Sequence, residues 1–236
     1  MQIAGSIALV TGGNRGIGRQ YALELQRRGA AKIYVAARDP ERVDIPGVVP
    51  VALDITDPGS VAAAAQIATN VSLLINNAGI TTHQNLVTGN LERIRLEMET
   101  HYFGTLNVVR AFAPALSANG GGAILNMLSA LSWRSYDGAN AYAAAKAAEW
   151  SLTNGIRLEL AGQGTLVAGL HVGAVDTDMM AGWDIEKFDP AELVRIALDG
   201  IEAGKLEIIV DDTAEQARAA LALDPSQAYA GVVVGG

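Results

Sequence analysis

The chain contains no cysteine among its 236 residues. This absence excludes disulfide bonds and thiolate metal sites, and it fits a reducing compartment. Aromatic residues are also scarce, and no apolar run reaches the roughly 18 residues that a membrane span needs. The opening residues, MQIAGSIALVTGG, lack the basic region and the cleavage site of a signal peptide. We therefore expect a cytoplasmic protein that has no membrane partner.

Positive charge is in short supply as well. The chain has 17 lysine and arginine residues against 25 acidic ones, which gives a net charge of −8. Because a phosphate backbone is bound mainly through clustered cations, nucleic acid is not an expected partner. The histidines and the scattered acidic residues have neither metal-ligand spacing nor the spacing of a catalytic carboxylate pair, so we predict no metal site.

What the chain does contain is an alternation of short β-branched segments with amphipathic segments, a pattern typical of a doubly wound parallel sheet. The expected strands are 6–11, 32–37, 48–53, 73–76, 123–127, 165–171 and 206–210. The expected helices are 17–28, 60–68, 91–116, 140–160 and 190–203, with a short one at 213–221. No repeat, linker or change of composition divides the chain. We predict a single Rossmann-like α/β domain over residues 1–236, a parallel seven-stranded sheet with helices on both faces.

Two segments are unusual for such a fold. Only the ten residues 38–47, which include Pro40 and Pro46, join the second and third expected strands. A parallel crossover normally takes a dozen or more residues and a helix, so this helix should be vestigial or absent. The tail 230–236 is apolar, and we expect it either to dock on a neighbouring subunit or to be disordered.

The first expected strand runs into the sequence TGGNRGIG, and a helix follows. Glycines at positions 12, 16 and 18 permit a tight turn, close approach of the backbone to a diphosphate, and close packing of helix on strand. The N-terminus of the helix then offers free N–H groups and the positive end of its dipole. The position of this loop between a strand and a helix therefore predicts dinucleotide binding.

The end of the second strand indicates which dinucleotide is bound. A free ribose 2′-hydroxyl usually meets an acidic residue there, whereas this chain has Ala36-Ala37-Arg38. Arg15, inside the glycine loop, is a second cation. Two guanidinium groups suit a 2′-phosphate, so we predict NADP(H) in preference to NAD(H). The alternative is that Arg38 is a solvated loop residue and Asp39 is the ribose acid.

A candidate catalytic group follows further along the chain. Tyr142 and Lys146 are four residues apart on an expected helix and so share one face. Ser129 stands just past the carboxyl end of the fifth strand, at the edge where open α/β sheets bind ligands. A serine hydroxyl can hold a carbonyl oxygen, and a phenol can give that oxygen a proton as hydride arrives. A neighbouring ammonium is expected to favour the phenolate and so to bring Tyr142 closer to neutrality.

Taken together, the glycine loop, the run Asn76–Gly79, Ser129 and the Tyr142-Ala-Ala-Ala-Lys146 motif resemble the short-chain dehydrogenase/reductase family, from Ile7 to about Thr177. The resemblance implies that Lys146 holds the nicotinamide ribose as well as tuning Tyr142. It implies a set of cofactor contacts: Thr11, Gly12, Asn14, Arg15, Gly16, Ile17, Gly18, Arg38, Asp54, Ile55, Asn77, Ala78, Gly79, Tyr142, Lys146, Val175 and Thr177. It also implies a homodimer or homotetramer.

The sequence departs from the family pattern at two positions. His101 stands three residues before Gly104, where the family usually has an asparagine that supports a proton relay, and Val172 replaces a proline. His101 lies on an apolar helical stripe and should turn inward. Two interpretations stay open: His101 is a packed core residue, or its ring nitrogen holds the relay water as a fourth member of the catalytic group.

We therefore predict an NADP-dependent oxidoreductase that interconverts an apolar, cyclic or aromatic ketone or aldehyde and its alcohol. The apolar segment 178–189 motivates the substrate class, and Trp133, Tyr136 and Trp150 are expected near the site or at a subunit contact. The alternative is a catalytically weak, dinucleotide-binding regulatory protein. Such a protein would usually have lost part of the Ser129, Tyr142 and Lys146 set, which is complete here.

Overall fold

The structure, a computed structural model, describes residues 1–229, so the apolar tail 230–236 lies outside the described residues. Seven parallel strands form one sheet in the order β3-β2-β1-β4-β5-β6-β7. The strands are β1 (Ile7–Thr11), β2 (Lys32–Ala37), β3 (Val49–Ala52), β4 (Leu73–Asn76), β5 (Ala123–Met127), β6 (Leu166–His171) and β7 (Glu207–Ile209). The strand order reverses between β1 and β4, and such a reversal opens a crevice at the carboxyl edge of the sheet.

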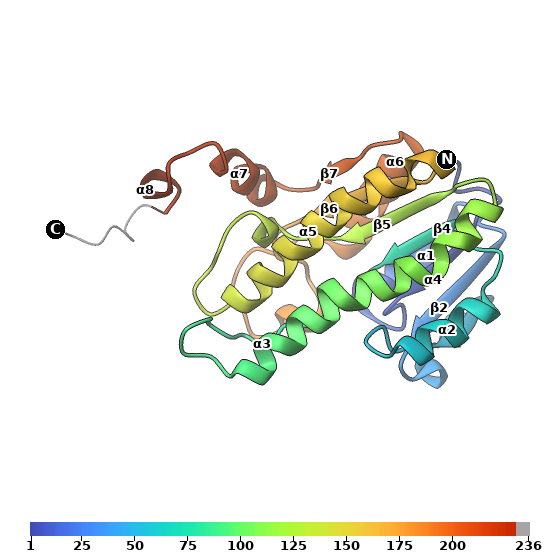
Figure 1. Cartoon of the computed structure of the whole chain (residues 1–236), viewed down its shortest axis with the longest axis horizontal. Coiled ribbons are helices and arrows are strands. Elements are labelled where there is room, and N and C mark those ends of the chain that lie inside the picture. Colours follow the sequence, from blue (N-terminus) through green and yellow to red (C-terminus); the bar gives the residue numbers. More distant parts are fainter. Residues whose placement is uncertain (230–236) are drawn as a thin grey trace.

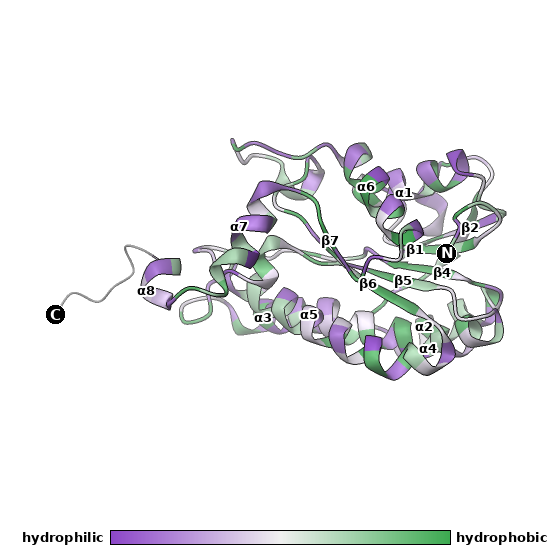
Figure 2. Cartoon of the chain, turned by 90° about the horizontal axis from the view of Figure 1, so that it is seen from above, coloured by the Kyte–Doolittle hydropathy of each residue, from purple (hydrophilic) through white to green (hydrophobic). Residues whose placement is uncertain are grey.

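Helices cover both faces of this sheet (Figures 1 and 2). One face carries α1 (Gly16–Arg27) and α6 (Pro190–Glu202). The opposite face carries α2 (Pro58–Ile67), α4 (Thr105–Ala118) and α5 (Asn140–Leu160), with α3 (Leu91–Met98) leading into α4. The doubly wound, Rossmann-like class predicted from the alternating pattern is confirmed.

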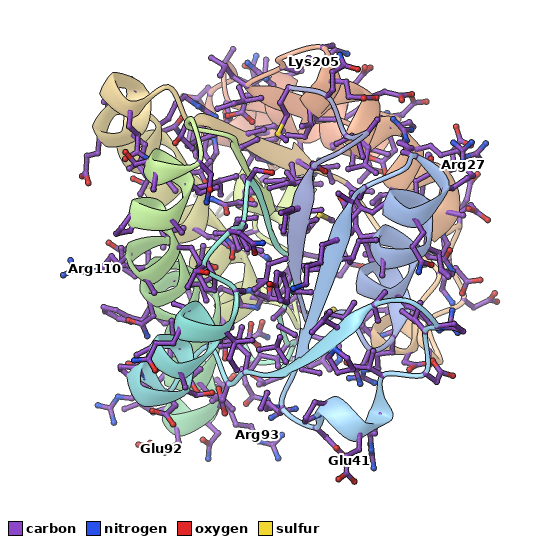
Figure 3. All side chains as sticks on the ribbon, turned by 90° about the vertical axis from the view of Figure 1, so that its right-hand side faces the viewer. Arg27, Glu41, Glu92, Arg93, Arg110 and Lys205 are labelled. Atoms are coloured by element: carbon purple, nitrogen blue, oxygen red, sulfur yellow. The ribbon has the colours of Figure 1, made fainter. Side chains whose placement is uncertain are left out.

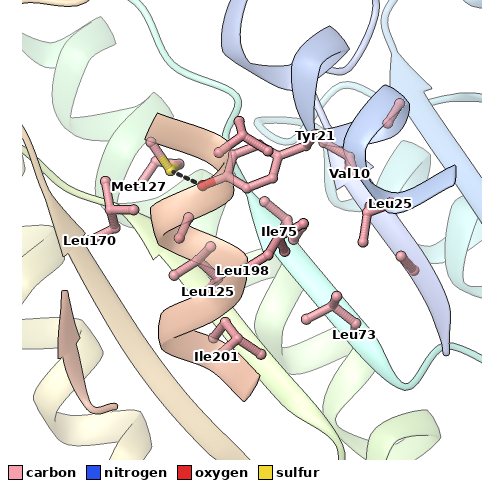
Figure 4. Packing of buried hydrophobic residues seen from close by; sticks show 14 of the residues in the cluster. Val10, Tyr21, Leu25, Leu73, Ile75, Leu125, Met127, Leu170, Leu198 and Ile201 are labelled. Atoms are coloured by element: carbon pink, nitrogen blue, oxygen red, sulfur yellow. Dashed lines mark hydrogen bonds between the residues drawn. The ribbon is translucent and has the colours of Figure 1, made fainter. Parts of the chain in front are cut away.

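Alternate residues of each strand supply two separate apolar layers. Ala8 and Val10 of β1 face α1 and α6, whereas Leu9 between them faces α2, α4 and α5. Figure 4 shows the first layer, in which the Tyr21 hydroxyl lies 3.1 Å from the sulfur of Met127. Burial raises the pKa of Tyr21 above its ordinary value, so this phenol is neutral. The contact ties α1 to the end of β5, close to the candidate catalytic serine.

The connection between β2 and β3 has no α-helix, as the short segment 38–47 predicted. It contains only a 3₁₀ turn, η1 (Pro40–Arg42), which begins with a proline and ends after one turn. The predicted helix 60–68 instead starts two residues earlier, because Pro58 takes the first helical position and Asp57 accepts a hydrogen bond from Gly59 N–H.

The predicted helix 91–116 is interrupted. Between α3 and α4 lies a π-helical turn, η2 (Glu99–Gly104), which carries one residue more than a regular turn. The apolar stripe continues across it, so the hydrophobic period alone gives no sign of the interruption. The extra residue lets buried side chains come from adjacent positions, Thr100 and His101.

The C-terminal part packs against the loop that follows β5. Helix α7 (Asp212–Ala220) places Ala214 and Ala217 against Trp133, and a short helix, α8 (Pro225–Ala228), follows. Trp133 is buried and meets Trp150 edge to face, with ring centroids 5.9 Å apart. Trp133 anchors this small cluster and stacks on His171, whose Nδ1 lies 3.2 Å from the Ser129 carbonyl oxygen, so it lies near the candidate site, whereas Tyr136 is exposed.

Charged side chains lie mostly at the periphery. Figure 3 shows six of them pointing outward: Arg27, Glu41, Glu92, Arg93, Arg110 and Lys205. Within residues 1–229, no helix is long and apolar enough to span a membrane. Against this pattern, the buried charged residues Glu97, Lys146 and Glu149 stand out, and all three lie beside the candidate site.

Candidate functional site

The glycine loop joins β1 to α1 in a conformation that its glycines make possible. Gly12 and Gly16 have φ angles of 63° and 51°, in the left-handed region that side chains rarely adopt. A Cβ on Gly18 would press on the Gly12 carbonyl oxygen and lie 2.6 Å from Asn77 Nδ2. The first turn of α1 can therefore pack closely on the loop and present its N-terminus to the crevice.

Two side chains join this loop to the end of β4. The Thr11 hydroxyl oxygen accepts hydrogen bonds from the backbone N–H groups of Asn77 and Ala78, each at 3.0 Å. The Asn77 amide donates in return to the carbonyl oxygens of Thr11 at 2.9 Å and Gly12 at 3.2 Å. These bonds fix the two loops on either side of the point where the strand order reverses.

A cleft of about 500 Å³ lies at this edge. Most of the predicted cofactor contacts line it: Thr11, Gly12, Asn14, Arg15, Gly16, Ile17, Arg38, Asp54, Ile55, Asn77, Ala78, Gly79 and Thr177. Gly18 lies behind the loop, Val175 is buried, and Tyr142 and Lys146 lie beyond the lining residues. Asp39, the alternative ribose acid, also lines the cleft, as do Arg42 and Met179, which were not among the predicted cofactor contacts.

Cations gather at the end of the cleft next to β2. Arg38 and Arg42 both line it, and Arg42 lies 3.1 Å from the Asp39 carboxylate. Asp39, the alternative ribose acid, is thus engaged by an arginine that sequence analysis did not single out. The Thr56 hydroxyl and backbone hold the pKa of Asp54 below its ordinary value, and Arg38 adds to this effect. Arg15 instead reaches across the cleft mouth to Asp178, at 3.3 Å.

The candidate catalytic group gathers at the carboxyl end of β5. Ser129 is the N-cap of a short 3₁₀ turn, η3 (Ala130–Ser132), and its hydroxyl oxygen accepts a hydrogen bond from Leu131 N–H at 3.1 Å. Lys146 is buried, and its ammonium donates to the Met127 carbonyl oxygen at 2.6 Å. As a cap, Ser129 uses its oxygen as an acceptor, and a hydrogen bond from its hydroxyl group acts to lower the pKa of Tyr142.

The Tyr142 phenol lies among charges of both signs. Burial raises the pKa of Tyr142, the Lys146 ammonium lowers it, and Glu149 and Glu97 raise it again. The net direction is upward. Lys146 acts in the expected direction by favouring the phenolate, but in the protein alone burial and the two carboxylates outweigh it.

Glu149 is a residue of this site that the sequence analysis missed. Its side chain is only 1% exposed, and Lys146 donates to its Oε2 at 2.7 Å while the Thr105 hydroxyl donates to its Oε1 at 2.9 Å. Burial would lower the pKa of Lys146, but Glu149 reverses the direction and raises it. The available signal was spacing, since Glu149 follows Tyr142 by seven residues and Lys146 by three and so shares their helix face.

His101 points inward from the π turn, as its apolar stripe predicted. Its Nε2 lies 2.8 Å from the Ile80 carbonyl oxygen, and its ring meets the Tyr142 ring edge to face at 5.2 Å. A Cβ on Gly79 would lie 2.7 Å from the His101 ring, so the cleft-lining loop rests directly on the imidazole. Burial, aided by Lys146, lowers the pKa of His101 well below its ordinary value, and the ring is neutral. Its part in a proton relay stays a prediction.

His171, one of the histidines whose spacing in the sequence predicted no metal site, has an acidic neighbour in the fold. Its Nε2 lies 2.8 Å from Glu207 Oε2, and its Nδ1 lies 3.2 Å from the Ser129 carbonyl oxygen. The imidazole stacks on Trp133 with centroids 3.6 Å apart. Since β6 and β7 are adjacent, parallel pairing brings these residues together although 36 positions separate them. The contact supports the backbone at Ser129.

The two parts of the segment 178–189 differ in exposure, since its first part is exposed and its end packs against the core. Met179, Trp183 and Ile185 are exposed, and the Trp183 ring lies 5.9 Å from His83. Phe188 instead forms a bridge with Val175 and packs against the apolar layer beneath α6. The exposed apolar side chains thus lie on the part of the segment that follows Thr177, and Met179 among them lines the cleft.

Comparison with known proteins gives consistent matches. The sequence model described as short chain dehydrogenase matches residues 6–187. A sorbitol dehydrogenase of Cereibacter sphaeroides is 33% identical, with 83% of this chain and 80% of that protein covered. A short chain dehydrogenase of Burkholderia cenocepacia, solved in complex with NADP, is 39% identical over 100% of both chains with a TM-score of 0.94. A short-chain dehydrogenase of Sphingobium yanoikuyae, in complex with NADPH, is 30% identical over 86% of this chain and 87% of that one, with a TM-score of 0.76.

Proposed function

The chain belongs to the short-chain dehydrogenase family of oxidoreductases, and we propose that it uses NADP(H) to interconvert an apolar ketone or aldehyde and its alcohol. The observation that carries the proposal is the convergence of Ser129, Tyr142 and Lys146 at the carboxyl end of β5. His101 packs on Tyr142 and touches Gly79, a lining residue of the cleft, so the candidate catalytic group adjoins the candidate cofactor site.

The residues of the cleft fit a dinucleotide. A side chain at position 18 would collide with the loop, and left-handed φ angles at 12 and 16 favour glycine, so the loop keeps its backbone free for a diphosphate. We propose that this loop and the N-terminus of α1 hold the phosphates, with Asp54 and the segment Asn77–Gly79 on the adenine-ribose side and Val175 and Thr177 at the carboxamide. The bound nicotinamide would supply hydride or accept it.

The chain's own groups would then hold the substrate and move one proton. The Ser129 and Tyr142 hydroxyls donate hydrogen bonds to the carbonyl oxygen, which polarises the carbonyl bond. As that oxygen gains negative charge, the Tyr142 O–H bond breaks and its proton forms the alcohol hydroxyl. Lys146 stabilises the phenolate that is left. In the oxidation direction the same proton returns to Tyr142.

A preference for NADP(H) is supported by charge. Arg38 and Arg42 line the β2 end of the cleft, where a 2′-phosphate would lie, and Arg15 stands at its mouth. A guanidinium offers two parallel donors to a phosphate, whereas a 2′-hydroxyl needs an acceptor. The NADP and NADPH complexes of the two similar dehydrogenases point the same way.

The exposed apolar side chains of Met179, Trp183 and Ile185 support an apolar substrate, since they follow Thr177 at the edge of the cleft. We further propose a homodimer or homotetramer in which α4 and α5 take part. Leu158 of α5 is 81% exposed, which is unusual for a side chain of its size in a helix that faces only solvent. Light scattering of the purified protein would give the mass of the assembly.

The test begins with NADPH and NADH titrations, in which the fluorescence of the three tryptophans reports binding. We expect NADPH to bind at least ~10-fold more tightly, and Arg38→Asp to reverse the order. Turnover is then followed with cyclohexanone and benzaldehyde, with Tyr142→Phe as the inactive control. Tight NADPH binding without turnover of any carbonyl would favour the regulatory alternative, and failure to bind either nucleotide would refute the proposal.

A further inference from the structure

Lys146, Thr105 and Glu149 form a hydrogen-bonded network behind Tyr142, and His101 lies beside it. Glu149 lies at its centre, since Oε2 accepts from Lys146 at 2.7 Å and Oε1 accepts from Thr105 at 2.9 Å. His101 Nδ1 lies 3.8 Å from Glu149 Oε2 and is otherwise a buried nitrogen without a hydrogen-bond partner. The network is sealed, because the exposed fractions of Glu149, His101 and Lys146 are 1%, 1% and 5%.

The Glu149 carboxylate reduces the effect of the Lys146 charge on Tyr142. Within residues 1–229, Lys146 is the one ammonium group beside Tyr142, and Glu149 offsets its charge at a distance where opposite charges interact strongly inside a protein. Burial raises the pKa of Glu149, and the ion pair with Lys146 and the hydrogen bond from Thr105 oppose that effect. The other titratable groups that face this pair are Glu97 on α3, His101 in the π turn and His171 on β6, which acts on Glu149. Glu97 is already held by the Thr82 hydroxyl and N–H, both at 2.6 Å.

We propose that Glu149 is a positioning residue whose carboxylate holds Lys146 as an ammonium and keeps the Tyr142 phenol protonated, so that the resting site is a proton donor set for carbonyl reduction. The inference rests on the proposed function for the catalytic meaning of Tyr142. No step is added to the reaction, because the Tyr142 proton still goes to the substrate oxygen. Glu149 sets only the protonation state of Tyr142 and Lys146 before the reaction begins.

The imidazole of His101 lies beside the network. Ile80 offers it both a carbonyl oxygen at 2.8 Å and an N–H at 3.4 Å, each near Nε2. Because the carbonyl contact is the shorter one, the proton lies on Nε2 and is donated to the Ile80 carbonyl oxygen, which leaves Nδ1 facing Glu149 Oε2 at 3.8 Å without a hydrogen to donate. The negative charge on Glu149 is therefore supported by Lys146 and Thr105 rather than by His101.

The direction of the effect does not depend on which group titrates. Tyr142 and Lys146 are close enough to lose their protons as a coupled pair. Removing a neighbouring negative charge makes the loss of a proton easier from either member of the pair. Glu149→Gln, which keeps the shape and removes the charge, should therefore lower the pH at which the pair ionises.

The experiment titrates Tyr142 directly. Protein containing tyrosine labelled with ¹³C at the ζ carbon is titrated by NMR, and Tyr142→Phe assigns the resonance among the six tyrosines. We expect ionisation to begin at least about one pH unit lower in Glu149→Gln than in the parent. Glu159→Gln removes the same charge from the exposed side of the same helix, and we expect it to leave the titration unchanged.

An unmoved onset in folded Glu149→Gln would overturn the proposal. If that variant does not fold, Thr105→Val leaves Oε1 without its donor and favours the neutral acid, so a smaller shift in the same direction is expected, and its absence would be equally decisive. Since the titration needs neither cofactor nor substrate, it can be read even if the proposed function fails. If Glu149→Gln shifts the Tyr142 titration but leaves the pH profile of alcohol oxidation unchanged, the role of Glu149 as a positioning residue for the reaction is overturned.

Discussion

Gly18 in the first turn of α1 and Gly12 in the loop before it are in contact through backbone alone, with no room for a Cβ between them. Gly18→Ala would push the loop away from Asn77, whose Nδ2 would lie 2.6 Å from the new methyl group. Because the diphosphate is proposed to rest on this loop, we expect NADPH affinity to fall at least ~10-fold and stability to drop by about 1–3 kcal/mol. Fluorescence titration and thermal unfolding would measure the two effects.

Gly155→Ala is the matched control for Gly18→Ala. Gly155 lies inside α5, and a Cβ there meets nothing within 4 Å. Alanine at this position should stabilise the helix by about 0.5–1 kcal/mol and leave nucleotide affinity unchanged. Equal loss of affinity in both variants would mean that the packing at Gly18 has no special importance.

Asp178 would compete with a bound phosphate for the guanidinium of Arg15. The two side chains lie 3.3 Å apart but are 71% and 79% exposed, so the ion pair is worth at most about 1 kcal/mol. Asp178→Asn should release Arg15 and tighten NADPH binding up to ~5-fold at low salt, with little effect at high salt. Titrations at two ionic strengths would check this, and weaker binding in the variant would contradict a role for Arg15 at the phosphate.

The neutral, buried His101 predicts a pH dependence of stability. Its pKa is lowered in the folded protein, whereas in the unfolded chain it titrates near ~6.5. Below that pH the unfolded chain binds a proton that the folded chain does not, so the parent should lose up to about 1.4 kcal/mol per pH unit on acidification. Urea unfolding between pH 8 and pH 5 should show a shallower slope for His101→Asn.

His83 provides the control for this slope. It is exposed and has a φ of 53°, a conformation that asparagine tolerates well. His83→Asn should follow the pH dependence of the parent. If His101→Asn and His83→Asn give parallel curves, the imidazole at position 101 is not the group responsible.

Asn126 joins two strands and a helix through its amide. It accepts from Asn76 Nδ2 at 2.8 Å and donates to the Thr153 hydroxyl at 2.9 Å, all inside the core. Asn126→Ala would leave a buried amide without a partner and should destabilise the fold by about 2–3 kcal/mol. Denaturant unfolding would measure this, and a change below ~0.5 kcal/mol would mean that the network carries no net stability.

Local pattern predicted the sheet because each strand is a short, mostly apolar run between turn residues. β2 and β5 begin and end at the predicted residues, and β1 differs by one. The convergence of Tyr142, Lys146 and Ser129 was also predictable, because helical spacing and the end of a parallel strand fix where such side chains point. These features depend on residues close in sequence or on a single rule of topology.

The charges around Tyr142 were not predictable in the same way. Glu97, Thr105 and Glu149 come from three different elements, and their burial depends on how those elements pack. A glutamate among alanines in a helix usually faces solvent, so pattern favours an exposed Glu149. Likewise Glu207 meets His171 only because β6 and β7 are neighbours in the sheet.

The π turn Glu99–Gly104 makes the number of residues between α3 and α4 important for the structure. A residue removed from it would leave a regular helix, yet everything before the turn would rotate by about 100° relative to everything after it. Glu97 would then leave the interior while Val108 and Phe112 stayed in place. In evolutionary terms the turn behaves as a single-residue insertion, and the environment of Tyr142 depends on the spacing of the chain as much as on the identity of its residues.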